Sequence, residues 1–233
     1  MQTPAPPRMG RALYGLAGGL LLAGLVFGRG DERGVNRIPK PIRMLSSALV
    51  LLAALLQARA ARAGRLVAAG MACGFVGDLI MSELIPLPEH VLFGMLAFGV
   101  GHGCYLRALA ERARAEQLND PAARRAALGV AWLVGALGWL GLARNPRLGA
   151  ALNYGALAYA LLLASMAGAA SALAAQRRRY ARLALGGWLF LLSDMILAAR
   201  LFRQAHFAQI GDLVWLTYLG GQALIVDGMR TDG

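Results

Sequence analysis

The chain has 233 residues, of which 58% are hydrophobic and 15% are charged, and its mean hydropathy is +0.54. Soluble domains are closer to half apolar and a quarter charged, so this composition excludes a soluble fold, a disordered chain and a disulfide-rich secreted scaffold. Apolar runs close to the length that a helix needs to cross a bilayer recur along the sequence. We therefore predict an all-α integral membrane protein, a bundle of about eight transmembrane helices.

The apolar runs divide the chain into helices with short connections, and consecutive helices are expected to pack as antiparallel neighbours. Together they are predicted to form a single polytopic membrane domain over residues 1–233. The first run follows Arg8 and Arg11, and we interpret it as a retained helix because many further spans follow it. The predicted helices are 12–28, 42–58, 65–85, 90–110, 126–143, 149–174, 182–203 and 210–228.

The basic residues predict the orientation. Of 24 basic residues 23 are Arg, and they lie between the apolar runs, which is a topological signal and not a nucleic-acid interface. With a cytoplasmic N-terminus, the inner segments hold 15 of them and the outer segments hold nine. We therefore expect a bacterial inner-membrane protein with both termini in the cytoplasm and no nucleic-acid partner. The first outer loop, which includes Lys40 and Arg43, goes against the rule.

Two acids lie deep in predicted helices. Asp78 and Asp194 each lie two or three residues past the middle of helices that run in the same direction, so they are expected at nearly the same depth. Ionisable groups at such positions are costly and are usually functional or paired. Two carboxyls that share a cavity can provide one protonated acid and one carboxylate near neutral pH, the arrangement that acid–base hydrolysis needs. The alternative is a pair of helix-packing acids bonded to the backbone.

Several other polar residues are candidates for a site. His102 lies between Gly101 and Gly103 with Tyr105 on the same face, which fits either a packing histidine or a group that orients substrate. A zinc site from Asp78, His102 and Asp194 is conceivable, but no HxxxH or HExxH spacing occurs, so we predict no metal and no cofactor.

The remaining polar residues divide between interface and bundle. Lys40 is expected at the interface, as a solvated anchor or facing headgroup phosphates, and Glu83 is expected near the outer end of its helix. Tyr159 is interpreted as a residue that makes a hydrogen bond within the helix bundle. Two glycine strings are interpreted as helix-packing faces: Gly15, Gly18 and Gly19, and Gly135, Gly138 and Gly141.

A weak internal echo suggests a four-plus-four repeat. The run from Gly77 to Met81 resembles the run from Ser193 to Leu197 at an offset of 116 residues, and Gly101-His102 resembles Gly221-Gln222 at an offset of 120. Parallel repeats of this kind are common in membrane folds and often hold a site at the repeat interface.

The motifs together resemble the YhhN-type integral membrane proteins, the bacterial relatives of the eukaryotic transmembrane lysoplasmalogenases. The resemblance covers residues 38–226 and rests on the order and spacing of several short motifs. The first stretch, GDLIMSELIPLPEHVLFGMLAFGVGHGCYL, supplies Gly77, Asp78, Phe93, Gly94, Phe98, His102 and Tyr105. The blocks FLLSDMILAARLF and TYLGGQALIV supply Ser193, Asp194, Tyr218, Gln222, Leu224 and Ile225, and Lys40-Pro41 also fits.

The resemblance implies an enzyme with eight helices that hydrolyses the vinyl ether bond of a lysoplasmalogen, a lysophospholipid, to a fatty aldehyde and glycerophosphoethanolamine or glycerophosphocholine. Asp78 and Asp194 would be the catalytic acid and base, in either order. The substrate-binding residues would be His102, Tyr105, Gln222, Tyr218, Ser193, Lys40 and Glu83. Two alternatives stay open: a metal-dependent membrane lipid amidase or hydrolase, and a proton-coupled transporter of lipids or small molecules.

Overall fold

The computed structural model describes residues 7–31, 34–58 and 62–230. Within these ranges the chain is all-helical, and it contains no strand. The long helices are α1 (Pro7–Phe27), α2 (Lys40–Gln57), α3 (Arg62–Met81), α4 (His90–Ala115), α5 (Pro121–Gly138), α6 (Ala150–Gln176), α7 (Ala181–Arg203) and α8 (Ile210–Gly228). A π-helical turn, η1 (Trp139–Ala143), extends α5, and a 3₁₀ turn, η2 (Arg178–Tyr180), precedes α7.

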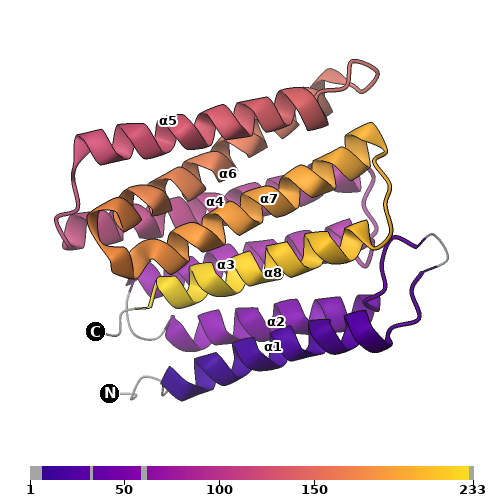
Figure 1. Cartoon of the computed structure of the whole chain (residues 1–233), viewed down its shortest axis with the longest axis horizontal. Coiled ribbons are helices and arrows are strands. Elements are labelled where there is room, and N and C mark those ends of the chain that lie inside the picture. The colour runs from indigo at the N-terminus through magenta and orange to yellow at the C-terminus, as the bar shows by residue number, and fades with distance from the viewer. Residues whose placement is uncertain (1–6, 32–33, 59–61, 231–233) are drawn as a thin grey trace.

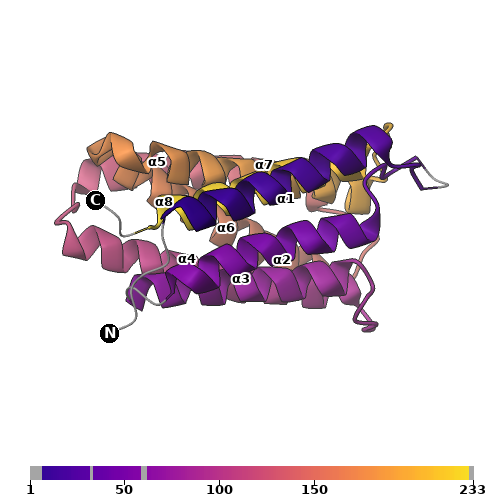
Figure 2. The ribbon, with the colours of Figure 1, turned by 90° about the horizontal axis from the view of Figure 1, so that it is seen from below.

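The helices run side by side along one long axis (Figure 1). Figure 2 shows two layers, with α2, α3 and α4 in one and α1, α8, α7 and α5 in the other. Of the described helices, all but α8 are long and apolar enough to cross a membrane, which makes seven candidate spans. Large apolar side chains such as Leu22, Leu52 and Leu133 are exposed on the outside of the bundle, as expected for helices that face lipid. The architecture confirms the predicted all-α membrane bundle.

Most consecutive helices pack as antiparallel pairs, but α4 and α5 do not. α5 packs mainly on α6, whereas α4 packs on α3 and on α6, so that α6 lies between α4 and α5. Small residues make this possible: a Cβ atom at Gly135 of α5 would lie 2.9 Å from the Cβ atom of Ala164, and Gly99 of α4 faces Leu162. The expectation that every consecutive pair would be adjacent is therefore wrong at this point, because α6 presents two close-packing faces.

The helix ends differ from the sequence estimates for identifiable reasons. α3 stops at Met81 and not at residue 85, because Glu83 takes a left-handed conformation (φ 57°) and Leu84 N–H bonds back to the carbonyl of Leu79. α4 and α5 extend beyond their apolar runs, since charged residues end an apolar run without ending a helix. Asp120 caps α5 by accepting a hydrogen bond from Ala122 N–H, with Pro121 in the first turn.

Each end of the bundle is held by a buried or half-buried acid. Asp212 of α8 is only 1% exposed, and its two oxygens accept the backbone N–H groups of Arg37 and Ile38 at 2.5 and 2.9 Å, which fastens the α1–α2 loop. At the opposite end, Glu116 accepts from Tyr180 and pairs with Arg179. Partial burial raises the pKa of Glu116, but the hydrogen bonds from Arg179 and Tyr180 outweigh burial and hold that pKa below its ordinary value.

Glycines on α3 create the space for three polar or aromatic side chains at the centre of the bundle. A Cβ atom at Gly70 would lie 2.5 Å from the ring of Tyr105, and one at Gly77 would lie 2.7 Å from the ring of Phe98. At Gly74 it would lie 2.8 Å from Nε2 of Gln222. By contrast, Gly15, Gly18, Gly19 and Gly141 have no neighbour within 4 Å, so only Gly135 and Gly138 of the two predicted packing strings are close contacts.

Gly70→Ala is expected to lower the free energy of unfolding by about 1–3 kcal/mol, the usual cost of overpacking a core. The new methyl group would meet both the ring of Tyr105 and, at 3.0 Å, the backbone carbonyl of Gly101, which has little freedom to move. The measurement is the midpoint of thermal unfolding in detergent micelles. Gly18→Ala, in open space on α1, is the matched control and should leave the midpoint unchanged or raise it slightly.

Candidate active site

A polar cavity of about 320 Å³ lies between α2, α3, α7 and α8, and both Asp78 and Asp194 line it. α3 and α7 run in the same direction, and the two acids come from equivalent depths of these helices. Both aspartates therefore line one cavity, as their similar depth in the predicted helices indicates.

Asp78 is 3% exposed and ends a chain of hydrogen bonds. It accepts from the hydroxyl of Ser47 at 2.5 Å and from the hydroxyl of Tyr218 at 3.0 Å. Behind Tyr218, Gln222 Nε2 lies 3.4 Å from the tyrosine oxygen, and Tyr105 donates to Gln222 Oε1 at 2.7 Å. Every donor in this chain points toward Asp78, so the groups polarise one another and hold the carboxyl in one orientation.

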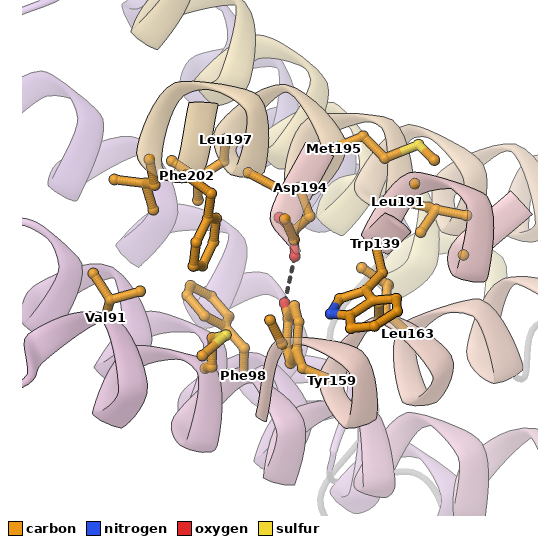
Figure 3. Close-up of a pocket in the computed structure, with 18 of the residues that line it drawn as sticks. Val91, Phe98, Trp139, Tyr159, Leu163, Leu191, Asp194, Met195, Leu197 and Phe202 are labelled. Atoms are coloured by element: carbon orange, nitrogen blue, oxygen red, sulfur yellow. Dashed lines mark hydrogen bonds between the residues drawn. The ribbon is translucent and has the colours of Figure 1, made fainter. Parts of the chain in front are cut away.

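Asp194 is held by a second, shorter chain. It accepts a hydrogen bond from the hydroxyl of Tyr159 on α6, and that hydroxyl lies 3.3 Å from Nε2 of His102 (Figure 3). Because Tyr159 donates its single hydrogen to Asp194, its oxygen accepts from an Nε2–H of His102. The other ring nitrogen, Nδ1, is buried and has no partner among the described residues.

Two phenylalanine rings separate the two chains. Phe190 lies edge-on to His102, with ring centroids 4.7 Å apart, and edge-on to Tyr218 at 5.1 Å. Phe98 closes the cluster against Phe190 and Tyr218, with centroid separations of 6.2 and 5.9 Å. These rings pack on Tyr218, which contacts Asp78, and on His102, which contacts Tyr159, so they lie between the two hydrogen-bond chains.

A second, apolar pocket of about 80 Å³ meets the polar cavity at Asp194 and Phe98 (Figure 3). It lies between α4, α5, α6 and α7, and its walls include Leu163, Leu191 and Trp139. Asp194 lines both spaces, whereas Asp78 lines only the polar cavity. The combined site is therefore polar on one side of Asp194 and apolar on the other.

The structure distributes the predicted substrate-binding residues over three positions. Tyr218, Ser193, Lys40 and Glu83 line the polar cavity. The hydroxyl of Ser193, however, donates to the carbonyl of Val214 at 3.0 Å, which ties α7 to α8. His102, Tyr105 and Gln222 do not line either space: each lies behind a tyrosine and reaches an aspartate through it. Their contact with substrate stays a prediction; in the structure they bond to the tyrosines that contact the two aspartates, directly or through Gln222.

Sequence reasoning missed two contacts of the acids. Ser47 sits in an ordinary apolar run of α2, and nothing in its neighbourhood distinguishes it from the adjacent Ser46. Tyr159 does make hydrogen bonds within the bundle, but its partners are two of the predicted site residues, Asp194 and His102. The only sequence signal is that Tyr159 is a polar aromatic residue inside a long apolar helix.

Among the described residues, no three His, Cys, Asp or Glu side chains cluster closely enough to hold a metal ion. Asp78, His102 and Asp194, the set considered from the sequence, are kept apart because Tyr159 and Phe190 stand between them.

The comparisons with known proteins bear on the same stretch of chain. The model of the YhhN family matches residues 40–229. No curated protein matches the chain, and no solved structure matches it. The matched segment contains every residue of both hydrogen-bond chains and every residue that lines the two spaces except Asn36.

Proposed function

We propose, from the premise that this chain belongs to the YhhN family, that it is a membrane-embedded hydrolase that cleaves the vinyl ether bond of lysoplasmalogens by acid–base catalysis. The observation that carries the proposal is that two aspartates from different helices line one cavity beside an apolar pocket. The products are a fatty aldehyde and a glycerophospho-alcohol.

The reaction needs one proton donor and one carboxylate. The acid adds a proton to the carbon of the double bond that is farther from the ether oxygen, which gives an oxocarbenium ion. Water then attacks the carbon next to the oxygen and loses a proton to the carboxylate, forming a hemiacetal. The hemiacetal collapses to the alcohol and the aldehyde, so the net change is the addition of one water. A carboxylate close to the cation stabilises the transition state.

The two aspartates can be assigned to different roles by their positions. In the substrate the carbon that is protonated lies on the side of the hydrocarbon chain, and the water attacks nearer the glycerol. Asp194 borders the apolar pocket, so it is the acid in our proposal. Asp78 lines only the polar cavity, where water and the glycerol end of the substrate would lie, so it is the base in our proposal.

The test is aldehyde release from a choline lysoplasmalogen by purified protein in D₂O, with and without a chelator. Protonation of the double bond should place one deuterium on the carbon next to the aldehyde carbonyl, which mass spectrometry of the trapped aldehyde detects. We expect aldehyde with a single deuterium and turnover that the chelator does not reduce. Chelator-sensitive turnover would favour the metal-dependent alternative, and folded protein that releases no aldehyde would refute the proposal.

A further inference from the structure

The mouth of the polar cavity carries three cations that the proposed chemistry does not use. Lys40 and Arg43 come from the first turn of α2, and Arg200 comes from the last turn of α7. None of the three forms an ion pair with a carboxylate in the part of the chain that the structure describes. Three cations around one opening repel one another, so this arrangement is costly without an anion.

Arg43 is held in place with part of its hydrogen-bonding capacity unused. Its Nη1 donates to Asn36 Oδ1 at 2.8 Å, and its guanidinium carbon lies 5.6 Å from the ring centroid of Trp215. Its Nε is buried and has no partner among the described residues. The neighbouring acid Asp212 already accepts two backbone N–H groups from the α1–α2 loop. Arg43 is thus a positioned donor that has an unpartnered Nε and no direct ion pair with a carboxylate of the described residues.

The other two cations complete a ring from separate helices. Lys40 Nζ donates to the carbonyl of Ser82 at 2.8 Å, which places its charge at the start of the α3–α4 loop. Arg200 lines the same opening and forms no ion pair with the acids of the described part of the chain. Guanidinium and ammonium groups converging on one opening are the usual recognition chemistry for phosphate oxygens.

We infer that Lys40, Arg43 and Arg200 form a phosphate-binding site at the mouth of the cavity. The ligand is a phosphate ester, and the inference rests on the proposed function in taking that ester to be the headgroup of the lysophospholipid. The lipid then lies with its phosphate at the mouth, its glycerol beside Asp78 and its chain in the apolar pocket beyond Asp194. Glu83, the exposed acid on the same rim, is placed to face a positively charged choline or ethanolamine.

The test measures binding without hydrolysis, in maltoside micelles that contain no phosphate. The probes are a saturated alkyl-ether lysophosphocholine, which has no double bond to protonate, the matching alkylglycerol without phosphate, and inorganic phosphate. Arg200→Gln is the main variant because this side chain forms no ion pair within the described residues, and Lys40→Gln is the second. Arg147→Gln, an exposed arginine at the same end of the bundle, is the matched control for net charge. Dissociation constants come from calorimetry.

We expect Arg200→Gln and Lys40→Gln each to weaken lysophosphocholine binding about tenfold, with alkylglycerol binding and the Arg147→Gln control unchanged. If inorganic phosphate competes with the lipid in wild type but not in Arg200→Gln, the result would support this phosphate site and show that it also binds free phosphate. Equal losses for alkylglycerol, or no loss for lysophosphocholine, would overturn the inference. Because the probe cannot be hydrolysed, phosphate-dependent binding without any aldehyde release would refute the proposed function alone.

Discussion

Asp194→Asn is expected to lower kcat for aldehyde release by about 10²- to 10⁴-fold, because the amide cannot donate the proton that starts the reaction. Asp78→Asn should cause a loss of the same order, since the cation and the attacking water would face a neutral group. The measurement is the initial rate of aldehyde formation by protein whose size-exclusion profile and thermal midpoint match wild type. Asp227→Asn, near the last turn of α8 and at the far end of the bundle from the cavity, is the matched control and should retain full activity.

A small carboxylic acid distinguishes the two roles. The polar cavity of about 320 Å³ has room for formate once a carboxylate is replaced. Formate should restore activity to Asp194→Asn as the neutral acid, so the rescue should strengthen as pH falls. It should restore activity to Asp78→Asn as the anion, and that rescue should strengthen as pH rises. The opposite pattern would exchange the two assignments, and full activity of either variant without rescue would contradict the mechanism.

The fold was predictable from the sequence because a bilayer imposes a strong length and composition rule on every span. Apolar runs separated by arginines indicate membrane helices directly, and no tertiary information is needed. Helix ends were less predictable: α3 ends at Met81, just before Glu83, a non-glycine residue in the left-handed region that no sequence pattern marks. The packing of α4 and α5 on α6 also depends on how small residues on three helices fit together, and that fit is decided in three dimensions.

The acids were predictable for a different reason. A carboxyl in the middle of an apolar helix is rare and predicts a functional site, and helix rise alone puts Asp78 and Asp194 at similar depth, where both line one cavity. Their partners were not predictable, because Ser47 and Tyr159 are ordinary residues for membrane helices and gain their role only from the helix that they face. The same limit applies to His102, whose position suggested substrate contact but whose ring lies behind Tyr159.

The exception to the positive-inside rule has a structural explanation. In the predicted orientation, the first outer loop carries too many basic residues for its side of the membrane. Two of them, Lys40 and Arg43, line the cavity mouth. A third, Arg37, donates to the carbonyls of Val26 and Gly28 and so caps the end of α1. Arg37 caps a helix, and Lys40 and Arg43 belong to the proposed phosphate site. The positions of these three charges therefore have local reasons that are independent of the orientation of the chain in the membrane.

Filling the apolar pocket is expected to shorten the chain that the enzyme accepts. Ala198 of α7 lines this pocket, and Ala198→Phe would place a ring where the proposed substrate chain continues beyond Asp194. We expect kcat/KM for a hexadecenyl lysoplasmalogen to fall about tenfold or more, because the displaced methylenes lose their apolar contacts. An octenyl substrate, whose chain ends earlier, should lose much less.

The control is Ala158→Phe, the same substitution at an exposed position of α6 that lines neither space, and it should leave both rates unchanged. The informative quantity is the ratio of kcat/KM for the two chain lengths, since a general loss of folded protein lowers both rates and leaves the ratio constant. A ratio that shifts toward the short chain in Ala198→Phe alone places the hydrocarbon in this pocket. An unchanged ratio would mean that the chain leaves the site by another route, and Asp194 would then lose the positional argument for acting as the acid.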